Sequence, residues 1–504
     1  MVGSNIRKSI NFIKKVMKHW LAILIATGCA ISSRAQNKIN YVEYDLANGI
    51  HVILHEEHAT PIVAISVLYH VGSKNENPSR TGFAHFFEHL LFEGSENIER
   101  GEYSKLVEKN GGTLNANTSQ DRTYYYEILP SNQLELGLWL ESERMLHAKV
   151  ENIGIETQRS VVKEEKRQRV DNQPYASFIS EMFQRAFPKH PYRWVPIGSM
   201  EHLDAAQEKD YVQFYQDFYV PANATLSIAG DIPLEQTKKW IEMYFGSIPS
   251  GQAINLYRDQ LALSDDAFKI KYGVAKSDVN AKNPKLGTNK AGSQLYAELS
   301  ARPTVIPRTT KDNDPLKQTI EDTIYDNIQL PAVFMGYKIP DQKHPDAYAL
   351  EFMNEILSGG NSSRINKNLV EKQQIATYAS SFNYGLEDGG MNIFLALAKD
   401  MASLGSLKSA FDAQIEVIKN ELITEEEYQS VLNKFEKQVI EANSSMAGIA
   451  ESLADNHVYF GSAARVNQML DLYRKVTRAD IQRVAKTYLN NNARVILYYL
   501  PKEK

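Results

Sequence analysis

The stretch from residue 84 to residue 92, Ala-His-Phe-Phe-Glu-His-Leu-Leu-Phe, constrains this chain more than any other. Apolar residues surround three polar ones, and the pattern predicts a helix. In a helix, His85 and His89 lie one turn apart on the same face, so both imidazoles can bind one metal ion. Glu88 lies beside them but out of register, where it can reach a water molecule at the metal without displacing a ligand.

Three interpretations of this stretch are open. The polar groups could be hydrogen-bonded within a core, as polar side chains on apolar helices usually are. Three hydrophilic groups on a buried helix are costly without compensation, however, and the order His-x-x-Glu-His is the inverted zinc-peptidase signature. A closed structural zinc site would need a fourth ligand, and no Cys or further His lies at a suitable spacing. The stretch therefore favours a catalytic metal site.

A catalytic zinc ion needs a third protein ligand, and residues 156–167 offer a candidate. In a helical reading, Val161 and Val162 mark the inward side, and Glu165 follows one turn later on that side. Glu164 faces a different direction. The spacing alone leaves open whether Glu165 is a ligand or one charge of a solvated, salt-bridged helix.

The H-x-x-E-H stretch, followed 76 residues after His89 by Glu165, resembles the M16 metallopeptidases, the pitrilysin-like and insulinase-like family. The resemblance covers residues 40–250 strongly and residues 315–504 weakly. It implies that His85, His89 and Glu165 bind one zinc ion per chain and that Glu88 is the general base. The further matching motifs are Gly111 to Ala116, Thr118-Ser119, Asp121, His190-Pro191-Tyr192, Gly198, Tyr219 to Asn223 and Gly230-Asp231.

The resemblance also implies a substrate-binding strand. Residues 113–129 alternate in polarity and predict a strand that begins near the metal helix. In the family, the positions of Asn115 and Ala116 lie on an open sheet edge and contact the substrate. An ordinary strand inside a sheet is the alternative. The family often has a second Glu seven residues before the third ligand, whereas this chain has Gln158.

Length and charge limit the functional classes. The chain has 504 residues, enough for two or more domains. Its net charge of −5 is mild, and no basic stripe with interleaved aromatic residues is present, so we expect no nucleic-acid partner. The expected partners are peptide substrates.

The N-terminus predicts an export signal spanning residues 1–35. Five basic residues precede a short apolar run from Trp20 to Ile31, and Ser33-Arg34-Ala35 supplies a small-x-small cleavage site. We therefore expect a periplasmic protein with no transmembrane span in the mature chain. The alternatives are an uncleaved anchor and an outer-membrane lipoprotein attached through Cys29, the only cysteine.

The remaining chain predicts a repeated domain. The first domain spans residues 38–250, and residues 251–315 read as a polar linker or insertion with little core-forming content. In residues 316–504 the strand and helix pattern returns without a metal motif, which predicts two similar α+β domains. The resemblance implies α/β sandwiches of the LuxS/MPP-like type that face each other across a substrate-holding cleft.

The resemblance implies a zinc-dependent metalloendopeptidase that hydrolyses peptides or small unfolded proteins. Many family members carry an Arg and a Tyr in the second domain that bind the substrate near the zinc. The aligned positions here are Val370 and Thr377, and Tyr378 lies one residue late. The alternative function is therefore a peptide-binding or scaffolding subunit whose partner supplies this pair. We expect a homodimer, or a heterodimer with a second M16 chain.

Overall fold

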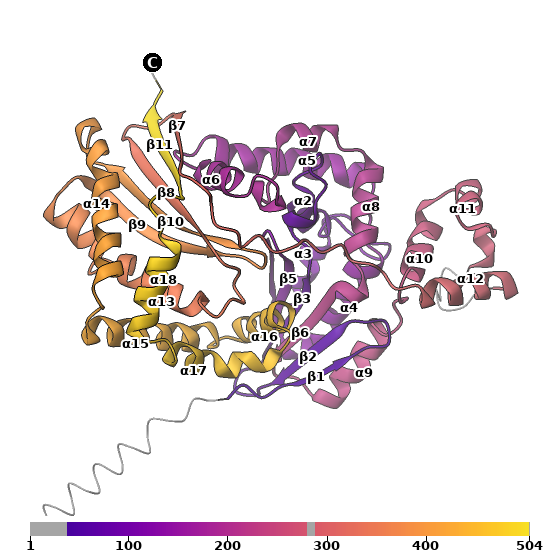
Figure 1. Ribbon diagram of the computed structural model, residues 1–504. Coiled ribbons are helices and arrows are strands. Elements are labelled where there is room, and N and C mark those ends of the chain that lie inside the picture. Colours follow the sequence, from indigo (N-terminus) through magenta and orange to yellow (C-terminus); the bar gives the residue numbers. More distant parts are fainter. Residues whose placement is uncertain (1–37, 280–287, 503–504) are drawn as a thin grey trace, which may run out of the picture. The chain divides into compact units, whose positions relative to one another are not determined.

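Two mixed β-sheets organise the chain in the computed structural model, which describes residues 38–279 and 288–502 (Figure 1). Both sheets belong to one unit that begins at Tyr41. The predicted signal segment and Cys29 lie outside the described residues. Strands and helices of both halves combine into an α+β architecture, which confirms the predicted fold class.

The first sheet has six strands in the order β1-β2-β6-β3-β5-β4. β2 and β6 are parallel, and the other neighbours are antiparallel. The tight turn between β1 and β2 contains Asn48-Gly49, and Gly49 adopts a φ of 98°, which favours glycine. The strands are β1 Val42–Asp45, β2 His51–Glu56, β3 Ile62–Tyr69, β4 Thr113–Thr118, β5 Thr123–Pro130 and β6 Ala224–Gly230.

The second sheet repeats this arrangement with five strands in the order β7-β11-β8-β10-β9. Here β7 and β11 form the parallel pair, so they correspond to β2 and β6. The central strand β8 then corresponds to β3, and the edge strand β9 to β4. The internal repeat predicted from the sequence is therefore present. The strands are β7 Ile320–Asp326, β8 Ala332–Ile339, β9 Ala376–Gly385, β10 Gly390–Ala398 and β11 Val495–Pro501.

Helices from the same half of the chain cover one face of each sheet. Alternate side chains of β3, such as Ile65 and Val67, enter a core that also contains residues of the surrounding helices. Met335 and Tyr337 of β8 do the same in the second half. The helices around the first core are α2 Phe83–Leu90, α3 Tyr103–Lys109, α4 Leu134–Leu146, α5 Asn152–Lys166, α7 Met200–Ala205, α8 Glu208–Phe218 and α9 Leu234–Tyr244. Those of the second half are α13 Ala347–Ser358, α14 Met401–Asn420, α15 Glu425–Ala442, α17 Met469–Arg474 and α18 Arg478–Tyr488.

The other face of each sheet is covered by a helix from the opposite half. Helix α16, Met446–Phe460, packs on β2, β3 and β6 of the first sheet (Figure 1). Helix α6, Phe178–Ala186, packs on β8 and β11 of the second sheet, where Met182 and Phe183 are fully buried. Each half of the chain thus contributes one helix that covers the sheet of the other half.

The expectation that residues 251–315 have little core-forming content is wrong. The described parts of this segment, residues 251–279 and 288–315, contain three α-helices around a small buried cluster that includes Leu256 and Phe268. The apolar residues are separated in sequence by polar ones but lie on one face of each helix. The overall composition of the segment therefore does not reveal that these residues form a core. The helices are α10 Ala253–Ala262, α11 Asp265–Tyr272 and α12 Lys290–Ala301.

Residues 113–129 form two strands rather than the single predicted one. The hydroxyl of Ser119 accepts hydrogen bonds from the backbone N–H groups of Asp121 and Arg122, at 3.1 Å each. This local turn reverses the chain and lets β5 return along β4 in antiparallel register.

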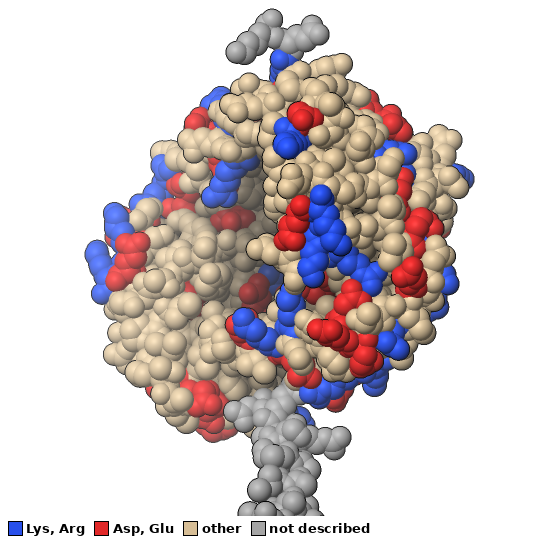
Figure 2. Space-filling view, turned by 90° about the vertical axis from the view of Figure 1, so that its left-hand side faces the viewer, with Lys and Arg blue, Asp and Glu red and all other residues tan. Residues whose placement is uncertain are grey.

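Charges of both signs lie side by side on the face shown in Figure 2, where the surface is also hollowed. Within residues 38–279 and 288–502, no helix combines the length and apolar character that a membrane crossing requires.

Candidate metal centre

Helix α2 is held at its N-terminus by a buried carboxylate. Its first turn follows Gly82, whose φ of 97° lets the chain enter the helix sharply. Glu76 accepts hydrogen bonds from the backbone N–H groups of Gly82 and Ala84, at 2.9 Å each. Burial raises the pKa of Glu76 to about 8, and these N–H groups act in the opposite direction. Glu76 thus satisfies donors that a helix start otherwise leaves unpaired.

The apolar side of α2 fixes its rotation about the helix axis. Phe83, Phe86, Phe87 and Leu90 are buried in the first core. This leaves His85 and His89 on the side that faces α5, which packs against α2. The 3.6-residue period thus brings both imidazoles to one location, as the sequence predicts.

Helix α5 supplies the carboxylate. Ile155 and Val162 are buried and fix its inward side. Val161, predicted to lie inward as well, is 44% exposed. Glu164 is exposed and accepts hydrogen bonds from Arg167 and Gln168. The carboxylate of Glu165, by contrast, faces the two histidines.

The structure brings His85, His89 and Glu165 together. Glu165 Oε2 lies 3.6 Å from His85 Nε2 and 3.2 Å from His89 Nε2. One ligand atom from each residue lies within 4.8 Å of the others, so one ion can contact all three. Glu165 Oε2 is buried and has no hydrogen-bond donor among the described residues. A buried carboxylate oxygen between two imidazoles fits a cation, and the donor set of two imidazoles and one carboxylate fits zinc.

Burial sets the protonation of these groups. It lowers the pKa of His85 to about 4, and the nearby charge of His89 acts in the same direction, whereas Glu165 opposes both. His85 is therefore neutral near pH 7, which is the form that binds metals. Burial also raises the pKa of the neighbouring Glu88.

The second oxygen of Glu165 has its own partner. Glu165 Oε1 lies 2.6 Å from Nη1 of Arg169. Arg169 belongs to a short π-helix, Arg167–Asp171, that continues α5. Residues four apart lie on one face of a helix, so the guanidinium lies beside the carboxylate one turn earlier. Arg169 thus orients Glu165 with Oε2 toward the histidines.

Gln158 contacts a different carboxylate. Its side-chain amide donates a hydrogen bond of 2.5 Å to Glu93 Oε1. Glu93 also pairs with Arg100 at 2.6 Å. Gln158 therefore belongs to a polar cluster with Glu93 and Arg100.

The candidate substrate-binding strand β4 is an edge of the first sheet and packs against α2. Asn115 is exposed and Ala116 is half-buried on this edge. The side-chain oxygen of Asn115 accepts a hydrogen bond of 2.9 Å from the backbone N–H of Ala116. β4 is the last strand of the first sheet, and this local bond occupies the backbone N–H of Ala116.

The aligned positions of the missing Arg and Tyr lie on the second half. Val370 belongs to a π-helix, Asn366–Lys372, and packs against the second core. Thr377 and Tyr378 lie on the edge strand β9, where both are exposed. The structure therefore places no cation at either aligned position.

Two family models match this chain, one after the other. Residues 51–193 match the model described as insulinase, peptidase family M16, and residues 206–435 match the peptidase M16 inactive domain. The chain belongs to the M16 family of peptidases. The first match contains both histidines and Glu165, and the second contains most of the half that lacks the metal motif.

M16 relatives resemble this chain along its full length. A protein named zinc protease PqqE from Helicobacter pylori is 28% identical over 97% of this chain and 99% of its own length. The crystal structure of a protease from Helicobacter pylori superimposes with a TM-score of 0.76 at 25% identity, over 92% of this chain and 100% of that one. The first half of the periplasmic protease PqqL from Escherichia coli has the same fold, with a TM-score of 0.65 at 17% identity and 92% coverage of both chains.

The roles of Glu76 and Arg169 are not apparent from the sequence alone. Glu76 lies outside the helix that it caps, and its spacing matches no local capping pattern. Arg169 is one of several basic residues in a charged helix, and its role depends on the direction in which Glu165 faces.

Proposed function

We propose that this chain is a zinc-dependent metalloendopeptidase that cleaves peptides or small unfolded proteins between two domains, residues 38–250 and 316–504. The observation that carries the proposal is the buried, donor-free Glu165 Oε2 between the Nε2 atoms of His85 and His89. One zinc ion bound there would supply Lewis-acid activation of a water molecule and of the scissile carbonyl.

The residues around the ion have separate roles in metal binding, proton transfer and peptide binding. His85, His89 and Glu165 hold the metal, and Glu88 takes a proton from the attacking water and passes it to the leaving amine. Glu88 suits this role because it lies on the same helix as both histidines without being one of the metal ligands. The edge of β4 at Asn115 and Ala116 holds the peptide in an extended conformation by backbone hydrogen bonds.

Replacing Glu88 by Gln tests this division of roles. We expect Glu88→Gln to retain one zinc ion per chain and to lower kcat by about 100- to 10,000-fold, because the amide cannot accept the proton. His85→Ala and Glu165→Ala should lose the zinc instead. Zinc content by mass spectrometry and cleavage of a quenched peptide library measure both effects. Turnover unchanged in Glu88→Gln would exclude it as the base.

A peptide-binding subunit is the second candidate function. The absence of a cation at the positions of Val370 and Thr377, both within the described residues, favours it. In this case a partner M16 chain supplies the substrate-binding pair. Size-exclusion chromatography with a peptidase assay on each fraction separates the two functions. Full activity of the purified chain alone would reject the need for a different partner.

We further propose that the protein is exported to the periplasm. The apolar segment Trp20 to Ile31 and the relative named periplasmic protease PqqL support this location. Cell fractionation tests it, and labelling with a lipid precursor before and after Cys29→Ala would reveal attachment to the outer membrane.

A further inference from the structure

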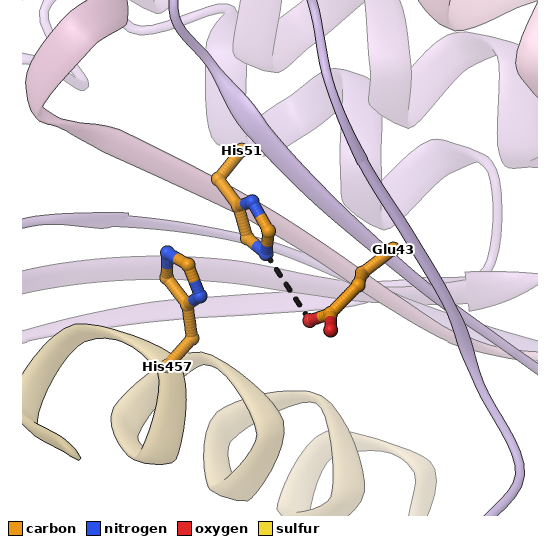
Figure 3. A group of neighbouring side chains, drawn as sticks. All are labelled: Glu43, His51 and His457. Carbon is orange, nitrogen blue, oxygen red and sulfur yellow. Dashed lines mark ion pairs between the residues drawn. The ribbon is translucent and has the colours of Figure 1, made fainter. Parts of the chain in front are cut away.

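A second cluster of two histidines and one carboxylate lies outside the first candidate centre (Figure 3). Glu43 is on β1, His51 is on β2, and His457 is on α16. One ligand atom from each lies within 4.8 Å of the others. The cluster therefore joins the first sheet to the helix that the second half contributes.

Asp45 fixes the orientation and tautomer of His51. The Nδ1 of His51 lies 2.8 Å from Asp45 Oδ1, so this nitrogen carries the proton and donates it. The carboxylate–imidazole pair is the arrangement that commonly supports a metal-binding histidine. It leaves the lone pair of Nε2 directed away from Asp45.

The Nε2 atom of His51 has an unfavourable environment without a cation. It is buried and has no hydrogen-bond partner among the described residues. It lies 3.4 Å from Oε2 of Glu43, so a lone pair faces a carboxylate oxygen. Two acceptors at this distance repel each other unless a positive charge lies between them.

His457, on α16, supplies the second imidazole of the cluster. The rings of His51 and His457 are stacked, with centroids 3.5 Å apart and planes 5° apart. In stacked parallel rings the nitrogen lone pairs do not point toward a common point. The half-exposed His457 ring must therefore rotate before both imidazoles can bind the same ion.

We propose that Glu43, His51 and His457 form a second binding site for a divalent transition metal of the zinc class. The ligand set of two imidazoles and one carboxylate suits such ions. The bound ion removes the contact between the two acceptors and attaches α16 to β1 and β2. The site is independent of the proposed peptidase function, because none of its residues belongs to the first centre.

Zinc titration of the full chain tests the second site. In the double variant His85→Ala/His89→Ala, which lacks the first centre, we expect one zinc ion per chain. Adding His457→Gln, which keeps most of the side-chain volume, should reduce this number to zero. Zinc should also raise the Tm of the double variant but not of the triple variant. Far-UV circular dichroism checks that each variant is folded.

Two further variants separate a metal site from an ordinary ion pair. Asp45→Asn should weaken zinc binding about 10- to 100-fold, because it no longer holds the imidazole as a metal ligand. His58→Ala is the matched control: His58 lies 3.3 Å from Glu56 and 2.6 Å from Asp231 but belongs to no candidate metal cluster within the described part of the chain. It should leave zinc binding unchanged. A double variant that binds no zinc would show that a proton on His51, rather than a metal, balances Glu43, and would overturn the proposal.

Discussion

The two oxygens of Glu165 have different environments, and this difference sets the orientation of the carboxylate. Oε1 contacts the exposed guanidinium of Arg169, whereas Oε2 is buried between two imidazoles. A carboxylate held by one oxygen presents the other to a metal without losing further side-chain freedom. Arg169 is thus a positioning residue that acts on the site through Glu165.

We expect Arg169→Ala to weaken zinc binding by about 10-fold, because Glu165 loses the partner that orients it. Competition with a chromogenic chelator measures the affinity. Arg167→Ala is the control, since Arg167 is a neighbouring arginine that pairs with Glu164 at 3.0 Å rather than with Glu165. Equal zinc affinities of the two variants would show that Arg169 is an ordinary surface charge.

The three polar residues of α2 were predictable from the sequence because their geometry is local. The spacing of His85 and His89 within one helix determines that they share a face. The position of Glu165 depends on how two helices pack, so periodicity alone left it unresolved and the family resemblance was needed. His51 and His457 are separated by most of the chain, and no local pattern in the sequence joins them.

Helix α2 begins at a residue with positive φ and depends on the distant carboxylate of Glu76. We expect Glu76→Ala to lower the free energy of unfolding by about 2 kcal/mol, because two buried N–H groups lose their acceptor. Glu76→Gln keeps one oxygen and should cost less. Urea unfolding measures both changes.

Glu102→Ala is the matched control for this prediction. Glu102 directly precedes α3 but makes no capping hydrogen bond with its side chain. Its replacement should change the free energy of unfolding by less than about 0.5 kcal/mol. A Glu76→Ala variant as stable as the Glu102→Ala variant would contradict the role of Glu76.

Strands and helices with a strong apolar period were predictable. The strand and helix pattern predicted to return in residues 316–504 is observed, for example in β8, Ala332–Ile339, and α13, Ala347–Ser358. The turn at Ser119 was missed because it depends on one hydroxyl within an otherwise alternating segment. The helices at residues 253–301 were missed because their short apolar faces are diluted by polar residues.

A buried charge network joins the two halves of the molecule. Nζ of Lys74, from the first half, lies 2.7 Å from Glu387 Oε2 and 3.3 Å from Asp388 Oδ2 of the second half. It also lies 3.0 Å from Oδ1 of Asp121. His70 donates a further hydrogen bond of 2.7 Å to Glu387. A buried lysine surrounded by carboxylates is strongly destabilising when its partners are removed.

This network predicts acid sensitivity. Burial alone would raise the pKa of Glu387, but His70 and Lys74 outweigh it and hold the pKa well below its ordinary value. Its stabilisation is therefore present above the unfolded-state pKa of about 4.3 and is lost as the pH falls below that value. Glu387→Gln should lower the free energy of unfolding at pH 7 by about 2 kcal/mol. In this variant the free energy of unfolding should also decrease less than in the wild type as the pH falls.

Urea unfolding at several pH values between 7 and 3 measures this dependence. Glu441→Gln is the control, because Glu441 is an exposed carboxylate that pairs with Lys437 at 3.3 Å. Its replacement should have little effect at any pH. Identical pH profiles of wild type and Glu387→Gln would show that another carboxylate dominates acid unfolding.

The exchange of α6 and α16 has a consequence for synthesis on the ribosome. Leu68 and Tyr124 on the first sheet are covered by Ala454 of α16. When the strands of that sheet leave the exit tunnel, this helix has not yet been translated. The apolar surface of the sheet therefore stays open until α16, Met446–Phe460, has been made, and the nascent chain needs a chaperone or a delay in compaction during that interval.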